Sequence, residues 1–194
     1  MRYADDWVMG FETVADARQM LADLKERLAK FGLSLHEDKT RLIEFGRLPA
    51  LARRQRSERR PETFAFLGFT HYCGWTRDGR FIVKHKTQSE RLTRKLKALR
   101  QEGWRLMHAP LAEQHRWYSS ILRGHYGYFG MPHNWRSLDT FHREVRRIWI
   151  TCLRRRSQRN RRMRWDQFQA LTECFPLPKP RISHPWVAGA RRCG

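Results

Sequence analysis

Two adjacent aspartates, Asp5 and Asp6, are the residues whose types and spacing point most directly to chemistry. They lie in the stretch RYADDWVMGF near the start of the sequence. Mg²⁺ prefers hard carboxylate oxygens and is commonly held by one or two of them together with substrate phosphates. The pair therefore suits a Mg²⁺ site, although a solvated turn is the more common role of such a pair taken alone.

The elements around the two aspartates would place them at a hairpin tip. Aromatic and β-branched residues flank the Ala-Asp-Asp unit, which predicts a strand, a tight turn and a second strand. Apolar residues then recur every three or four positions, which predicts a helix over 14–31. Thr13 and Asp16 form a capping-box pattern at its start, and Gly32 supplies the stop.

The next part of the chain reads as short strands and turns. The stretch LSLHEDKTRLIEFG predicts two strands, at 33–35 and 41–45, around a polar turn. The arginine-rich segment 47–62 predicts an exposed loop. FAFLGFTHYC and RFIVKHKT are strand-like, and the Asp78-Gly79 pair between them is a strong hairpin signal.

After residue 86 the pattern becomes helical. Thr87 and Glu90 form a second capping-box pattern. The expected fold class is α+β, with a small antiparallel sheet and one helix in residues 1–86, followed by an all-α part in residues 87–194. Apolar spacing predicts helices over 88–107, 111–129, 138–153 and 165–175.

The charge of the chain points to a polyanionic partner. Forty Lys and Arg against nineteen Asp and Glu give a formal net charge of +21, most of it after residue 88. Such a charge opposes compaction unless a polyanion neutralises it, so nucleic acid is the expected partner. The four cysteines are far apart and form no C-x-x-C pair, and no apolar run has transmembrane length. We therefore expect free thiols, no membrane partner and a cytoplasmic protein.

Two basic segments are candidates for RNA contacts. Residues 154–164 contain seven arginines with few acids nearby, a density that suits phosphate contacts, although a solvated helix end would also carry cations. The predicted helix 88–107 presents a second basic face, for which a merely solvated surface is nearly as good an interpretation. The candidate RNA-binding residues are Arg91, Arg94, Lys95, Lys97, Arg154, Arg155, Arg156, Arg159, Arg161, Arg162 and Arg164.

The order of several motifs resembles a known family. RYADDWVMGF, a helix, FGLSLHEDKTRLIEFG and FAFLGFTHYCG resemble the end of the palm domain of group II intron reverse transcriptases. RGHYGYFGMPHNWRSLDTFHREVRRIWITCLRRRSQR with FPLPKPRISHPW is similar to the family's thumb and maturase domain X. The resemblance spans nearly the whole chain.

This resemblance implies roles for particular residues. Asp5 would be a metal-ligating carboxylate with Asp6 as its neighbour, and Lys39 would stabilise the leaving pyrophosphate. Phe66, Leu67, Gly68 and Phe69 would form the primer grip. The alternatives are a surface ammonium for Lys39, and for the F-L-G-F stretch a core strand with close backbone approach at Gly68.

The resemblance also implies an incomplete polymerase site. Two-metal catalysis in this family uses a further aspartate from an upstream strand, and neither it nor the fingers is present in the sequence. We therefore expect binding of group II intron RNA in support of splicing, with Mg²⁺ at a half-site. cDNA synthesis on an RNA template and DNA primer would require a separate N-terminal reverse-transcriptase fragment. The alternatives are a stand-alone RNA-binding maturase remnant and a decayed mobile-element fragment.

Overall fold

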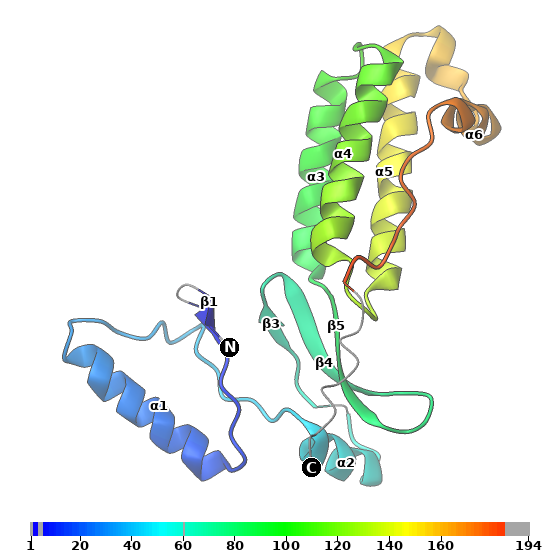
Figure 1. Ribbon diagram of the computed structural model, residues 1–194. Coiled ribbons are helices and arrows are strands. Elements are labelled where there is room, and N and C mark those ends of the chain that lie inside the picture. The colour runs from blue at the N-terminus through cyan, green and yellow to red at the C-terminus, as the bar shows by residue number, and fades with distance from the viewer. Residues whose placement is uncertain (1, 4–5, 60, 185–194) are drawn as a thin grey trace. The chain divides into compact units, whose positions relative to one another are not determined.

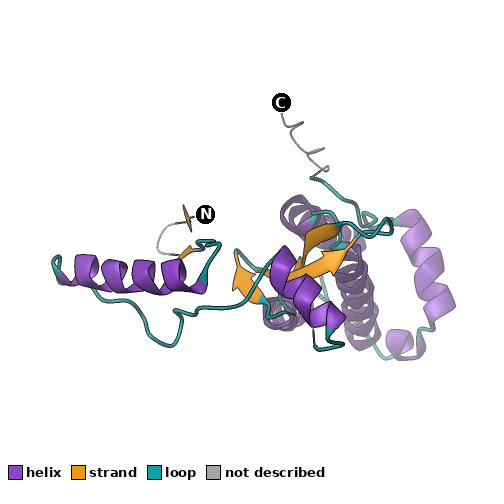
Figure 2. Ribbon diagram, turned by 90° about the horizontal axis from the view of Figure 1, so that it is seen from below, coloured by secondary structure: helices purple, strands orange, loops and turns teal. Residues whose placement is uncertain are grey.

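The structure of the chain is a computed structural model, and it describes residues 2–3, 6–59 and 61–184. The chain divides into two compact units. The first comprises Met1–Phe66 and Tyr72–Val83, and the second comprises Leu67–His71 and Lys84–Gly194. The described residues form six α-helices and a small three-stranded antiparallel sheet, which confirms the mixed α+β class (Figure 2).

The first unit begins with a short hairpin. Strands β1 (Arg2–Tyr3) and β2 (Asp6–Trp7) pair antiparallel, with Arg2 opposite Trp7 and Tyr3 opposite Asp6. The two predicted strands are thus confirmed, and the turn between them lies outside the described residues. Asp6 is the first residue of β2, whereas Asp5 lies outside the described residues.

Helix α1 (Val14–Ala29) follows, as its apolar spacing predicts. The Thr13 hydroxyl accepts a hydrogen bond from the backbone N–H of Asp16 at 3.1 Å. At the other end Gly32 has a φ of 68°, a left-handed conformation that glycine adopts without steric cost, and the chain leaves the helix there. No residue of α1 is buried, so its apolar stripe stays accessible.

Two predictions for the following segment are wrong. Residues 33–35 and 41–45 are not strands, because among the described residues no neighbouring strand pairs with them and a turn at 37–39 separates them. Within 47–62, Arg47–Gln55 is helix α2 rather than loop. Pro49 falls in its first turn, where a missing N–H costs nothing, and the buried Ala50 anchors it.

The sheet has the order β3-β4-β5, with β3 at Phe64–Phe66, β4 at Phe69–Trp75 and β5 at Phe81–Thr87. The strand-like stretches and the hairpin at Asp78-Gly79 are therefore confirmed. Between β3 and β4 the chain reverses in two residues, Leu67 and Gly68, whose φ angles are 48° and 81°. Two consecutive positive φ angles are typical of a type I′ hairpin turn.

Three long helices of the second unit lie side by side (Figure 1). They are α3 (Ser89–Arg105), α4 (Leu111–Phe129) and α5 (Trp135–Arg156), and α5 packs on both α3 and α4. The helix predicted over 138–153 extends further at each end. The buried core includes Tyr118, Leu122, Tyr126, Leu138, Phe141, Val145, Ile148, Trp149, Leu153 and Phe168.

The capping box predicted at Thr87 and Glu90 is wrong. Gln88 is the N-cap of α3 and makes no side-chain cap. Thr87 instead bonds to the buried Asn134, whose Oδ1 accepts from the Thr87 backbone N–H and whose Nδ2 donates to the Thr87 hydroxyl, both at 2.9 Å. Asn134 Nδ2 also donates to the Phe129 carbonyl at 2.8 Å. One asparagine therefore joins the end of β5 to the end of α4.

The chain ends its described part with a helix and an extended strap. After the 3₁₀ turn η1 (Arg159–Arg162), helix α6 (Trp165–Cys174) follows, as predicted. Residues 176–184, called the strap here, then run back along the bundle (Figure 1). Tyr126 donates to the Pro178 carbonyl at 3.2 Å, and the backbone N–H groups of Ser183 and His184 both donate to the Gly130 carbonyl.

The described cysteines are free thiols, as predicted. Cys73 and Cys152 are buried and Cys174 is exposed, whereas Cys193 lies outside the described residues. None of the helices in the described part of the chain has the length and apolar character needed to span a membrane.

Candidate nucleic-acid interface

Of the aspartate pair, only Asp6 lies within the described residues. Asp6 is exposed on β2, opposite Tyr3 in the hairpin register. Across residues 2–3, 6–59 and 61–184, no group of three or more His, Cys, Asp or Glu side chains is placed to hold a metal ion. Asp6 alone offers one carboxylate, which is too few ligands for Mg²⁺ without phosphates or water.

Lys39 is an exposed residue of the turn at 37–39. Its backbone N–H donates to the His36 carbonyl at 3.1 Å, and the Thr40 hydroxyl donates to the same carbonyl at 2.9 Å. These bonds fix the turn locally. In the described part of the chain the Lys39 ammonium forms no ion pair with Glu37 or Asp38, so it is available to an anion from outside.

The F-L-G-F stretch forms the tight β3–β4 turn. The Tyr128 hydroxyl donates to the Leu67 carbonyl at 2.9 Å, and the Phe69 ring stacks on that of Tyr128 with centroids 6.0 Å apart. A Cβ on Gly68 would lie 3.3 Å from an Arg91 guanidinium nitrogen. The close backbone approach expected at Gly68 is therefore present, and the role of this turn as a primer grip stays a prediction.

Helix α3 presents three of its four candidate cations to solvent. Arg91, Arg94 and Lys97 are exposed and recur every third residue, so they share one face of the helix. Lys95 differs, because its ammonium is half-buried, donates to His125 Nδ1 at 3.4 Å and lies 5.3 Å from the centre of the Phe141 ring. Burial lowers the pKa of Lys95. We expect Lys95 to contribute less than its three neighbours to phosphate binding.

His125 is the most strongly perturbed histidine of the bundle. Only 1% of it is exposed, its ring stacks on Phe141 at a centroid distance of 3.7 Å, and its buried Nε2 has no hydrogen-bond partner among the described residues. Burial, and then the nearby Lys95 charge, lower the pKa of His125 to about 3. The imidazole is therefore neutral at physiological pH.

Lowering the pH from 7 to 5 is expected to cost about 2 kcal/mol of unfolding free energy through His125. Because the pKa in the folded state lies below the ordinary value of 6.5, the unfolded chain takes up the proton first. The unfolding free energy is therefore unaffected by His125 above about pH 6.5, and it decreases progressively as the pH falls from there towards 3. Urea unfolding at both pH values should show that the unfolding free energy of His125→Phe changes less with pH than that of the wild-type chain. An equal change with pH in the two proteins would assign the titration to another group.

The arginine run at 154–164 folds back on itself from α5 through η1 to α6. Arg161 and Arg162 are exposed, and Arg154 is exposed but donates to the Met163 carbonyl at 2.8 Å. In the described part of the run, only Arg164 forms an ion pair with an acid, at 3.6 Å from Asp166. The described arginines without a carboxylate partner are Arg154, Arg155, Arg156, Arg161 and Arg162.

Two exposed tryptophans stand beside arginines of α5. The Arg155 guanidinium lies 4.9 Å from the centre of the Trp104 ring, and Arg146 lies at the same distance from Trp165. Trp104 is 38% exposed and Trp165 is 41% exposed. Aromatic faces next to cations suit stacking on unpaired bases. The sequence shows the tryptophans but not which of them stay exposed.

No protein-family model matches the chain, and neither a curated protein nor a solved structure is detectably similar to it.

Proposed function

We propose that the chain is a segment of a group II intron reverse transcriptase/maturase, covering the end of the palm and the thumb with domain X, and that its helical unit binds structured RNA. The observation that carries the proposal is the set of five described arginines within 154–164 that have no carboxylate partner. Unneutralised arginines at this density release counterions when they meet phosphates, which is the main source of nucleic-acid affinity. The order of the sequence motifs supports intron RNA as the ligand.

Replacing Arg161 and Arg162 by Gln is expected to weaken RNA binding about tenfold at moderate salt. For every phosphate that the variant no longer binds, the plot of log affinity against log salt should flatten by about 0.7 to 0.9. Filter binding of a structured intron RNA over a range of salt concentrations measures both quantities. The two side chains are exposed, so the substitutions should leave the fold intact.

Matched control variants test whether the loss of RNA affinity depends on the position of the arginines or only on the net charge. Arg18→Gln with Arg27→Gln removes the same charge from exposed positions of α1 and should leave the salt slope unchanged. Asp5→Ala with Asp6→Ala should leave RNA affinity almost unchanged, because we place binding in the helical unit. If the α1 variant lost RNA affinity equally, the loss would be explained by net charge alone. That result would contradict the assignment of RNA binding to residues 154–164.

A contribution to RNA-templated DNA synthesis is the second part of the proposal. The incompletely buried apolar stripe of α1 favours it, because this surface suits the packing of a further polymerase segment. In this proposal Asp5 and Asp6 contribute Mg²⁺ ligands, Lys39 contacts the leaving pyrophosphate and the β3–β4 turn holds the primer. Primer extension with Mg²⁺ should require a separately made fingers-and-upstream-palm segment and should be lost in Asp5→Ala. No extension by a mixture shown to associate would limit the function to RNA binding.

A further inference from the structure

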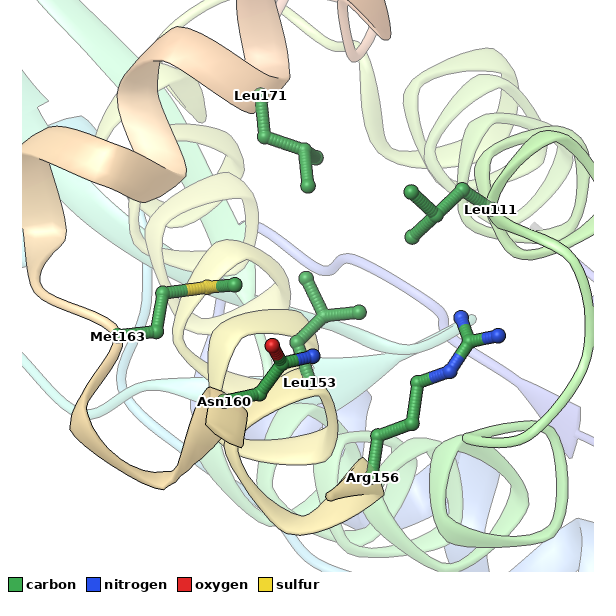
Figure 3. Close-up of a pocket in the computed structure, with 6 residues that line it drawn as sticks. All are labelled: Leu111, Leu153, Arg156, Asn160, Met163 and Leu171. Atoms are coloured by element: carbon green, nitrogen blue, oxygen red, sulfur yellow. The ribbon is translucent and has the colours of Figure 1, made fainter. Parts of the chain in front are cut away.

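A pocket lies within the second unit where α4 begins and α5 ends (Figure 3). It measures about 520 Å³, which falls in the range of small-molecule sites. Figure 3 shows its side chains arranged around a common space. Four of the lining side chains are apolar and two are polar. The lining residues are Leu111, Leu153, Arg156, Asn160, Met163 and Leu171.

The two polar side chains of the pocket are both unengaged. Within the described part of the chain, no hydrogen bond or ion pair is formed by the Arg156 guanidinium or by the Asn160 side-chain amide. Both residues are half-buried. A half-buried guanidinium and amide are incompletely solvated, so a ligand that pairs with them recovers hydrogen bonds that the free protein lacks.

A second, neighbouring pocket of about 460 Å³ provides a contrast. It is lined by Arg147, Ile150, Thr151, Arg154 and Trp165. Several of its polar groups have partners: Arg147 pairs with Glu144 at 2.7 Å, the Thr151 hydroxyl donates to the Arg147 carbonyl, and Nε of Arg154 donates to the Met163 carbonyl. The Arg156 and Asn160 side chains differ from these three, because neither forms a hydrogen bond or ion pair within the described part of the chain.

The chemistry of this pocket matches a nucleotide whose base is unpaired. Leucine and methionine side chains would cover the faces of a base, the Asn160 amide can donate to and accept from its edge, and Arg156 can bind the adjacent phosphate. Among the residues that the structure describes, no acidic side chain lines the pocket. The exposed Arg161 and Arg162 follow in the same segment, so the phosphates on either side of such a nucleotide would meet further cations.

We propose that this pocket binds a single unstacked base of an RNA, with Asn160 reading its edge and Arg156 holding its phosphate. The inference rests on the proposed function, because it assumes that RNA reaches the arginine run. It extends that function, because contacts to a base carry sequence information, whereas contacts to the phosphate backbone do not.

The test compares hairpin RNAs that share one stem and differ only at a single-nucleotide bulge. The bulge carries A, C, G, U or an abasic linker, which keeps the backbone and removes the base. Filter binding at fixed salt should give at least one base about tenfold higher affinity than the abasic hairpin. Asn160→Ala and the pocket-filling Leu171→Trp should each remove most of this preference. Gln158→Ala, an exposed amide in the same segment, should keep it.

The outcomes separate the two proposals. If the wild-type chain binds none of the hairpins, the proposed RNA-binding function itself fails. If it binds the base-bearing and abasic hairpins equally, RNA binding stands and the pocket inference is overturned. The inference is also overturned if both Asn160→Ala and Leu171→Trp keep the preference for base-bearing hairpins. If the tryptophan variant misfolds, the alanine variant alone decides this outcome. Binding of free AMP in equilibrium dialysis, without preference among the hairpins, would assign the pocket to a mononucleotide instead.

Discussion

Trp149→Ala is expected to lower the free energy of unfolding of the helical unit by about 3 to 5 kcal/mol. The Trp149 side chain is completely buried, and its ring contacts those of Tyr118 and Phe168 at centroid distances of 5.4 and 5.5 Å. Its indole Nε1 donates to Gln114 Oε1 at 3.0 Å. Alanine would leave a large cavity and also remove the partner of that buried oxygen, and both changes destabilise the folded state.

Urea denaturation followed by far-UV circular dichroism measures this loss. Trp135→Ala is the matched control, because Trp135 is 51% exposed at the start of the same helix. It should change the unfolding free energy by less than about 0.5 kcal/mol, as is usual for surface positions. Similar losses in the two variants would show that α5 does not bury the face described here.

Asn134→Ala is expected to cost about 3 kcal/mol, although it removes only a few atoms. Asn134 is 1% exposed, and its side chain bonds to the Thr87 N–H, the Thr87 hydroxyl and the Phe129 carbonyl. Alanine would leave these three groups without their partner in a site closed to water. An unsatisfied buried polar group costs about 1 to 3 kcal/mol, so the combined loss is large for an amide-to-methyl change.

The same chain offers a control for this substitution. Asn160→Ala removes the same amide from a position where it bonds to no described residue, and its effect on stability should be under about 0.5 kcal/mol. Thermal unfolding of both variants measures the difference. If Asn134→Ala unfolds at the wild-type temperature, the three groups must find other partners or water.

The helices of this fold were the most predictable elements, because their signals are local. Leu111–Phe129 matches the predicted range 111–129, since Pro110 and Gly130 mark its ends and apolar residues recur along one face. The stop of α1 at Gly32 was equally local. In each case the residues that decide the boundary lie within one helical turn of it.

The errors have a common physical cause, which is that the deciding partner lies far away in the sequence. Thr87 has the pattern of a cap, but its hydroxyl bonds to Asn134, 47 residues later. The strands predicted over 33–35 and 41–45 have suitable residues, but no strand of the described chain pairs with them. Local propensity does not report the presence of such partners.

The candidate site was predictable in its charge but not in its shape. The density of arginines between 154 and 164 is visible in the sequence, whereas the turn η1 that brings Asn160 beside Leu171 and Leu111 is not. The half-burial of Lys95 was missed for the same reason, because its partner His125 belongs to another helix. Packing between helices, not composition, distinguishes a pocket from a solvated face.

The strap ties the assembly of the bundle to the timing of protein synthesis. His115, Tyr126 and Gly127 of α4 bond to strap residues 52 to 61 positions later. At about 5 to 20 residues per second, a ribosome needs roughly 3 to 12 seconds to make the intervening chain. Throughout this interval the side of α4 that bonds to the strap stays uncovered. That side of α4 is therefore open to chaperones and proteases until the strap has emerged and bonded to it.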